Sequence, residues 1–298
     1  MQQASYFISS QRGIIAIAGE DRRTFLQGLV SNDVQRVSPE RAVYAALLTA
    51  QGRFLHDFFI AAIGDTLYLD CEAQRRDDLR RRLSLYRLRS KVTLTDVSEQ
   101  FAVGLLFGDS VLSRFGLPAE PGHAASLGGG CVFVDPRLAE LGARAVLPRA
   151  SAADTLAGLG LTPGTNDAYD RLRLSLGVPD GSRDLPVEKA ILLENGFDEL
   201  NGIDWQKGCY MGQELTARTR YRGLVRKRLL PVAIEGPLPA PGTPVRLGDA
   251  EVGEMRSSSD GAGLALLRLE HVDSGPLTAG ESRITPRRPA WMKTPEFQ

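Results

Sequence analysis

The chain has 298 residues and a mass of 32.4 kDa, and its 36 basic residues balance 36 acidic residues, so the formal net charge is zero. A hydrophobic content of 43% excludes a disordered chain and is sufficient for two compact domains or three small ones. Zero net charge argues against a protein whose whole surface binds DNA or RNA, because phosphate neutralisation requires an excess of Lys and Arg. A local basic groove remains compatible with these numbers.

The cysteines and histidines predict neither a disulfide framework nor a local metal site. Cys71, Cys131 and Cys209 form no C-x-x-C pair, and no two of the three histidines stand at the i, i+4 spacing of metal ligands on a helix. Unpaired thiols indicate a reducing compartment. The first ten residues lack the features of a signal peptide, and no apolar run approaches the ~20 residues of a membrane span. We therefore expect a cytoplasmic protein that has no membrane partner.

The N-terminal half predicts strands and helices in no strict alternation. A short apolar strand at 14–17 is followed by a helix that we expect Asp21 to cap. Later elements are expected as three hairpin strands at 43–50, 54–63 and 66–71, an arginine-rich helix at 74–88 and two strands at 91–97 and 101–107. The stretches 117–130 and 147–164, rich in Gly, Ala and Pro, are expected to form loops or the edges of a subdomain. This mixture predicts an α+β fold.

The C-terminal half predicts one helix and then a small β-domain. The helix runs from Asn166 and stops at Gly177, which is followed by Val and Pro. From Arg228 onward, short strands at 229–234, 243–247, 251–256 and 263–269 are separated by Pro and Gly. Evenly spaced short strands of this kind predict a small β-barrel or sandwich, with its boundary at 224–228.

Residues 207–214 form the densest candidate site. Their sequence is Lys-Gly-Cys-Tyr-Met-Gly-Gln-Glu, in which two glycines would let the backbone turn tightly and present the thiol of Cys209. The neighbouring Lys207 would favour the thiolate, which is the form that attacks electrophiles and ligates metals. A lone cysteine is also commonly a small buried apolar residue, and that alternative stays open.

Two groups of cations stand out. Six basic residues follow the Cys motif with no acid between 215 and 234, and they are Arg218, Arg220, Arg222, Arg226, Lys227 and Arg228. This run predicts either an anion-binding rim, which suits the bidentate guanidinium, or an ordinary solvated face. The arginines of the helix at 74–88 favour a solvated face, because Asp77 and Asp78 supply local partners.

Three polar residues interrupt apolar runs. His56 and Asp57 are adjacent within a strand, so they face opposite sides, and satisfied core residues are the commoner outcome for such a pair. Glu194, which follows two leucines, is either a helix-end residue or a buried acceptor for a ligand. The loops of dinucleotide and P-loop proteins and the motifs of zincins and serine hydrolases do not occur in the sequence.

The segment at 207–214, together with Ala217-Arg218 and Tyr221-Arg222-Gly223, resembles the signature of the YgfZ branch of the folate-binding YgfZ/GcvT (aminomethyltransferase-like) family. Further matches are Phe25-Leu26-Gln27-Gly28 with Asn32-Asp33, Gln51-Gly52-Arg53 with Asp57, Tyr169 with Arg173 and Gly177-Val178-Pro179, and Asn201-Gly202. Residues 183–186 and 208–228 are most similar to the mitochondrial and alphaproteobacterial members that assist iron–sulfur cluster assembly.

The resemblance implies an α+β fold in the form of a three-lobed ring. Two interleaved α+β lobes would occupy 1–225 and a small β-barrel 226–298, and they would enclose a central hole that binds tetrahydrofolate or a one-carbon derivative. The aminomethyltransferases lack the Lys-Gly-Cys motif. The resemblance therefore implies a folate-binding protein other than the glycine-cleavage enzyme.

The resemblance also implies roles for individual residues. Glu194 matches the glutamate that holds the pterin, although Leu192 replaces the proline of that Pro-x-Glu element, and a carboxylate suits the N–H edge of a pteridine. Asp57 matches the acid near the folate N5 and N10 atoms, while His56 replaces the family's second acid. Further folate contacts are expected from Tyr169, Arg173, Lys207, Arg218 and Arg222.

Three hypotheses for function follow from the resemblance and the residues. The first is a folate-binding accessory factor for assembly or repair of [4Fe–4S] proteins, in which Cys209 is redox-reactive or transiently contacts a cluster and iron–sulfur carriers or clients are the partners. The second is a folate-dependent one-carbon transferase that uses Asp57 as the acid at the reacting centre. The third, which the neutral charge disfavours, is a tRNA-modification accessory protein whose cations at 218–228 contact RNA.

Overall fold

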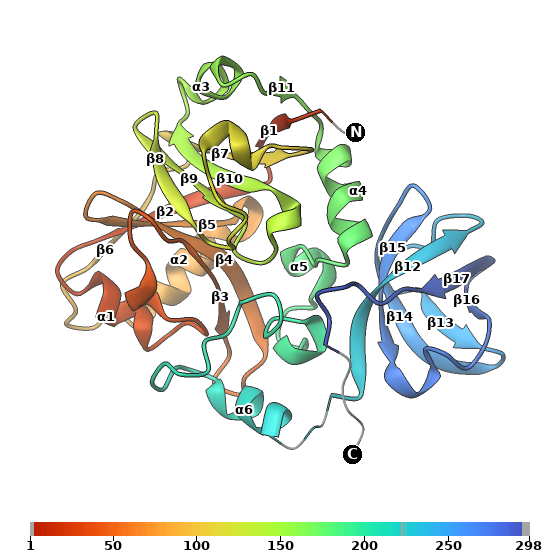
Figure 1. Cartoon of the computed structure of the whole chain (residues 1–298). Coiled ribbons are helices and arrows are strands. Elements are labelled where there is room, and N and C mark those ends of the chain that lie inside the picture. The colour runs from red at the N-terminus through yellow and green to blue at the C-terminus, as the bar shows by residue number, and fades with distance from the viewer. Residues whose placement is uncertain (1–2, 222, 224, 294–298) are drawn as a thin grey trace. The chain divides into compact units, whose positions relative to one another are not determined.

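A computed structural model describes residues 3–221, 223 and 225–293 (Figure 1). The chain forms two compact units, and each unit is built from three separate stretches of sequence. The first unit contains Met1–Leu48, His56–Tyr169 and Asn201–Met211, and the second contains Thr49–Leu55, Asp170–Leu200 and Gly212–Gln298. The predicted α+β class is confirmed. The predicted central hole and the boundary at 225/226 stay predictions.

The first unit contains a five-stranded sheet whose strand order is β3-β4-β5-β2-β6. The strands are β3 (Val43–Leu48), β4 (Phe54–Ile63), β5 (Thr66–Glu72), β2 (Arg12–Ala18) and β6 (Thr93–Asp96). β4 and β5 pair antiparallel across the tight turn at Gly64 and Asp65, with Ile63 opposite Thr66. All of β3 and nearly all of β4 are buried, so both strands are apolar at almost every position. The predicted meander of hairpins is confirmed here.

A six-stranded sheet forms the rest of the first unit, in the order β11-β1-β7-β10-β9-β8. The strands are β11 (Thr162–Pro163), β1 (Ser5–Ser9), β7 (Phe101–Phe107), β10 (Ala143–Pro148), β9 (Gly130–Val134) and β8 (Ala124–Leu127). The stretch 117–130, expected as loop or subdomain edge, includes β8 and the first residue of β9, which form a hairpin at the edge of the sheet. Position 130 requires glycine, because a Cβ there would lie only 1.9 Å from the Val146 carbonyl oxygen of β10.

Short helices complete the first unit. They are α1 (Arg22–Gln27), α2 (Arg76–Leu85) and α3 (Ala152–Gly158), with 3₁₀ turns at Val34–Arg36, Ala73–Arg75, Leu112–Phe115 and Ala139–Leu141. Asp21 precedes α1, but the prediction that its side chain caps this helix was wrong. Its carboxylate instead accepts a hydrogen bond from the Lys91 backbone N–H at 2.7 Å, which fixes the chain just before β6.

The second unit is dominated by a closed barrel in the order β12-β15-β14-β13-β16-β17. The strands are β12 (Lys227–Glu235), β15 (Ala262–Arg268), β14 (Ala250–Ser259), β13 (Pro244–Leu247), β16 (Leu277–Ala279) and β17 (Ser282–Pro286). Buried aliphatic residues from all six strands fill its interior. The predicted barrel is confirmed, and β16 and β17, which sequence patterning missed, close it.

The remaining elements precede the barrel along the chain, except η6, which connects β15 to β16. They are α4 (Asn166–Leu176), which begins in the first unit, and α5 (Gly181–Asp184), η5 (Leu192–Asn195), α6 (Gln213–Tyr221) and η6 (Leu269–His271) of the second. Gly177 ends α4 at a φ of +75°, as the sequence predicts. In the described part of the chain, no helix is both long and apolar enough to cross a membrane.

Candidate functional site

Lys207 fixes the loop that carries the Cys motif. Its Nζ donates hydrogen bonds to the backbone carbonyls of Gln27, Val30 and Asn32 at 2.8, 2.7 and 2.8 Å. These carbonyls lie at and beyond the C-terminal end of α1, where backbone acceptors lack helical partners and a cation is favourable. Burial lowers the pKa of Lys207 to about 8. All three donors of the ammonium group are thus used to anchor the loop, and none remains for a bound molecule.

Further bonds hold the same loop against the chain that follows α1. The Met211 N–H donates to the Gly28 carbonyl, and the Ser31 hydroxyl donates to the Gly202 carbonyl at 2.6 Å. Asp204 folds the loop locally by accepting from the N–H groups of the second and third residues after it. Two motifs that are far apart in sequence, at 25–33 and 201–211, therefore lie together in the first unit.

Cys209 projects from this anchored loop into solvent. It is exposed, whereas Cys71 and Cys131 are buried, and burial raises the pKa of each of those thiols to about 12. The next residue, Tyr210, is buried, and its ring lies 5.2 Å from the Lys207 Nζ. The alternative that Cys209 is a buried apolar residue was wrong. Among the described residues, no group of three His, Cys, Asp or Glu side chains is placed to hold a metal ion.

Asp57 is held by Tyr44 within the five-stranded sheet. The Tyr44 hydroxyl donates to a carboxylate oxygen of Asp57 at 2.7 Å, and the two residues are 1% and 4% exposed. Burial and the neighbouring Asp57 carboxylate both raise the pKa of Tyr44, so the phenol keeps its proton and remains a donor. His56 contacts Asp78 of α2 instead, at 2.9 Å. The prediction that His56 and Asp57 are core residues with polar partners is confirmed.

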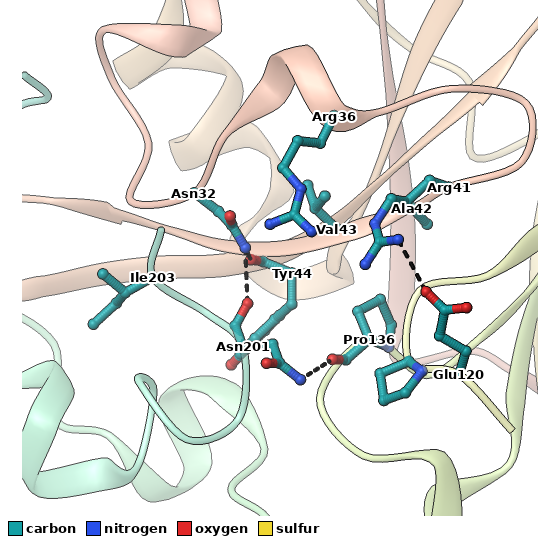
Figure 2. Close-up of a pocket in the computed structure, with 11 residues that line it drawn as sticks. Asn32, Arg36, Arg41, Ala42, Val43, Tyr44, Glu120, Pro136, Asn201 and Ile203 are labelled. Carbon is teal, nitrogen blue, oxygen red and sulfur yellow. Dashed lines mark hydrogen bonds and ion pairs between the residues drawn. The ribbon is translucent and has the colours of Figure 1, made fainter. Parts of the chain in front are cut away.

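A cavity of about 320 Å³ lies in the first unit beside Tyr44 (Figure 2). The guanidinium groups of Arg36 and Arg41 lie over the same side of it, paired singly with Asp204 at 3.3 Å and Glu120 at 3.1 Å. The Asn32 amide donates to the carbonyls of both Tyr44 and Asn201 at 2.7 Å, which ties the cavity wall to the Cys loop. We call this space the Tyr44 cavity.

A second cavity, lined by Glu194, lies in the second unit and measures about 550 Å³. Glu194 is half-buried, and no other described residue makes a hydrogen bond or ion pair with it. Its pKa is raised because burial disfavours the carboxylate, an effect that Lys227, Arg53 and Arg256 oppose. We call this space the Glu194 cavity. Its features are those of a ligand site, because a half-buried carboxylate there retains its full capacity to accept hydrogen bonds.

Local backbone geometry explains why Arg53 lines the Glu194 cavity. Gly52 has a φ of +81°, and a Cβ there would lie 2.7 Å from the Gly212 carbonyl oxygen and 2.6 Å from the Leu215 side chain. Only glycine allows this turn to lie so close to the start of α6. Arg53 then donates to the Lys189 carbonyl at 2.9 Å. The Gln-Gly-Arg and Gly-Gln-Glu motifs are therefore structural neighbours.

Arg173 and Tyr169 occupy buried networks and not the two cavities. Arg173 is 2% exposed and bonds to Asp170, to Asp184 at 2.8 Å and to Ser257 at 3.1 Å, which joins α4, α5 and β14. Tyr169, in the first unit, is 8% exposed and accepts a hydrogen bond from Arg137 at 3.3 Å. In this structure both residues stabilise the scaffold.

The cations after the Cys motif divide into three cases. Arg218 is exposed on α6, and Lys227 lines the Glu194 cavity. Arg228 is buried and pairs with Glu199. Arg222 lies outside the described residues. The run is therefore not one uniform rim, because the strand pattern of β12 turns alternate residues in opposite directions.

Sequence reasoning missed several cavity residues. Tyr44 lies in an apolar strand, and its only sequence signal is that it is the one hydroxyl-bearing side chain of β3. Arg36 and Arg41 are isolated surface-type cations. Arg53, Lys189 and Arg256 come from three distant segments that meet only in the folded unit.

Comparisons with known proteins agree with this architecture. Residues 2–111 match the GCVT N-terminal domain, and residues 226–294 match the C-terminal β-barrel domain of CAF17. The iron-sulfur cluster assembly factor IBA57 of mouse mitochondria is 33% identical over 95% of this chain and 84% of its own length. The human mitochondrial factor of the same name is 35% identical over 89% of this chain and 78% of its own. The chain belongs to the IBA57 family.

One solved structure shows how the IBA57 fold relates to a known enzyme fold. The aminomethyltransferase T of the glycine cleavage system from Bartonella henselae aligns with 98% of this chain and 87% of its own, with a TM-score of 0.78. Sequence identity is only 15%, so this likeness concerns the fold alone. The expected aminomethyltransferase-like architecture is confirmed.

The expectation of a cytoplasmic location was wrong on this finding. The IBA57 relatives of mouse, human, Mycosarcoma maydis and Neurospora crassa are all named as mitochondrial proteins, which points to mitochondria instead. The expectation rested on scattered free cysteines and on the absence of a secretory signal. Those features indicate a reducing compartment and do not separate the cytoplasm from another compartment that keeps thiols reduced.

Proposed function

We propose that this IBA57-family protein assists the assembly of iron–sulfur clusters in carrier or client proteins and binds tetrahydrofolate or a one-carbon derivative. The first part is supported by relatives that cover most of the chain and are named as iron-sulfur cluster assembly factors. The second part is supported by the aminomethyltransferase-like fold and by the Glu194 cavity.

The single observation that carries folate binding is the unpartnered carboxylate of Glu194. A half-buried acid that has no hydrogen bond within the described chain is costly to keep, unless a ligand supplies the donors. The pteridine ring has adjacent N–H and amino donors on one edge, which can bond to both oxygens of one carboxylate. Lys189 and Lys227 line the same cavity and would attract the carboxylates of the folate.

Cys209 is the residue that we propose for the iron–sulfur part of the function. Cys209 is exposed on a loop that Lys207 and a backbone bond from Met211 anchor, so its thiol would be accessible to a partner protein. A single thiol cannot complete the coordination of a cluster, so the partner must supply the remaining ligands. Cys209 would thus act transiently, in a complex with a carrier or client.

The experiment is complementation in cells that lack their own IBA57-family protein. Wild type is expected to restore the activity of [4Fe–4S] enzymes, and Cys209→Ser is expected to restore little of it. Cys131→Ser is the matched control, because it removes a buried thiol with no access to partners. Failure of wild type to restore activity would refute the proposed function, and full restoration by Cys209→Ser would remove the thiol from it.

A further inference from the structure

An exposed apolar segment follows α2, in the first unit. Five large apolar side chains are exposed in the described part of the chain, and three of them fall within four consecutive residues. These are Leu85, Tyr86 and Leu88, which are 67%, 43% and 87% exposed. Scattered surface leucines are ordinary, whereas a contiguous group of large apolar side chains marks an interaction site. We call residues 85–89 the 85–89 surface.

The two cations of the 85–89 surface have no ion pair within the described chain, in contrast to those of α2, although Asp21 lines the same hollow as Leu88 and Arg89. Within α2, Arg80 pairs with Asp77, while Arg81 and Arg82 pair with Asp78. Arg87 and Arg89 alternate with the exposed apolar residues, and neither has an ion pair with any other described residue. The surface therefore combines an apolar contact area with a local excess of positive charge.

The backbone of the 85–89 surface is held in a defined conformation. The N–H groups of Tyr86 and Arg87 still bond to helix carbonyls, and the Ser90 N–H bonds to the Arg87 carbonyl at 2.7 Å. Between them, Leu88 has a φ of +43°, a left-handed backbone conformation that is unfavourable for a residue with a side chain. Strained non-glycine positions of this kind cluster at functional sites. The turn presents Leu88, the most exposed of the large apolar residues, directly to solvent.

We propose that the 85–89 surface is a docking site for a partner protein, through a segment that presents acidic side chains around an apolar contact. Tyr and Arg are enriched in the centres of protein interfaces, and acidic groups on the partner would complement Arg87 and Arg89. This surface shares no residue with the Cys loop, the Tyr44 cavity or the Glu194 cavity, and the proposal does not depend on folate binding.

The other classes of partner fit the surface less well. A nucleic-acid surface needs many cations along a phosphate backbone, and exposed leucines contribute nothing to phosphate contacts. Stable attachment to an anionic membrane requires a long amphipathic helix or a lipid anchor in addition to a basic patch, and the exposed apolar group here spans four residues.

The test is selection of binders from a displayed random peptide library on the full-length protein, without folate or iron. Peptides that combine Asp or Glu with apolar residues are expected to be enriched. Leu88→Ser with Arg89→Glu is expected to weaken their binding by about tenfold or more, and added salt should weaken it further. Leu238→Ser with Arg283→Glu is the matched control, since it changes one exposed leucine and one exposed arginine of the barrel.

Several outcomes would overturn this proposal. They are the absence of acidic binders, equal binding to the test variant and to wild type, and binding that the control variant loses to the same extent. Vesicles of anionic lipid and an RNA oligonucleotide are assayed in parallel, and binding of either that the test variant loses, without peptide binding, would assign the surface to that class instead. A failure of folate binding would leave these readouts unchanged, so the two proposals fail separately.

Discussion

The three cysteines of this chain differ in how far solvent can reach their thiols. All three appear equivalent in composition, but Cys71 and Cys131 lie in strands β5 and β9 and are buried, while Cys209 lies on an exposed loop. Burial raises the pKa of the two strand thiols to about 12, so they are protonated at any physiological pH. The glycines around Cys209 were the sequence signal that its thiol would be presented to solvent.

Alkylation of the folded protein tests this difference. Because only a thiolate that solvent can reach is alkylated rapidly, iodoacetamide is expected to modify Cys209 and to leave Cys71 and Cys131 unmodified, as read by peptide mass spectrometry. Unfolding in denaturant should expose all three to the reagent. Modification of a strand cysteine before Cys209 would contradict the burial that the structure describes.

The burial of His56 makes the stability of the folded protein depend on pH. Burial, with the nearby Arg75, lowers the pKa of His56 from 6.5 to about 4, so the folded state keeps the imidazole neutral. The unfolded chain binds a proton below pH 6.5, and stability is therefore lost as pH falls from 6.5 toward 4. This loss should amount to about 2 kcal/mol at pH 5.

The measurement is urea unfolding of wild type and His56→Gln at pH 7 and pH 5. Contributions from other groups, including the raised carboxyl pKa values of Glu194 and Glu199, are common to both proteins and cancel in the comparison. The variant is expected to lose less stability than wild type between the two pH values. An equal loss would show that His56 does not titrate across this range on unfolding.

At the scale of elements, the site depends on the contact between the Cys loop and the C-terminal end of α1. The sequence predicts both motifs and the elements around them, because hairpin strands and the barrel strands carry strong alternation or burial patterns. It does not predict that the Lys207 ammonium group donates its hydrogen bonds to three backbone carbonyls. A bond to a backbone acceptor has no side-chain partner that could be recognised in sequence.

Lys207→Met tests this anchoring role. It removes three charge-assisted hydrogen bonds and leaves carbonyls at the end of α1 without a partner, so the free energy of unfolding should fall by about 2–3 kcal/mol. Limited proteolysis should also cleave faster near Trp205 and Gln206. Lys91→Met is the control, because its exposed ion pair with Glu20 should contribute less than about 1 kcal/mol. Equal effects of the two substitutions would count against the anchor.

At the scale of the whole molecule, each unit is assembled from three separate stretches of chain. Patterning predicts the α+β class and the barrel, but Asp170, Asp184 and Ser257 meet around Arg173 only because three elements pack together. Such a buried ionic network resembles a ligand-binding cluster when it is read from sequence. The Glu194 cavity could be predicted only through Glu194, since Glu254 and the cations that also line it come from scattered positions.

The measurement that tests the central claim most directly is the calorimetric titration of tetrahydrofolate into wild type, Glu194→Gln and Glu251→Gln. Glu251 is an exposed acid of β14 in the same unit and is the matched control. We predict saturable binding by wild type and Glu251→Gln, and binding that is about 10- to 100-fold weaker in Glu194→Gln, as loss of a charge-assisted bond implies. Absence of binding by wild type, or equal binding by all three proteins, would contradict the account.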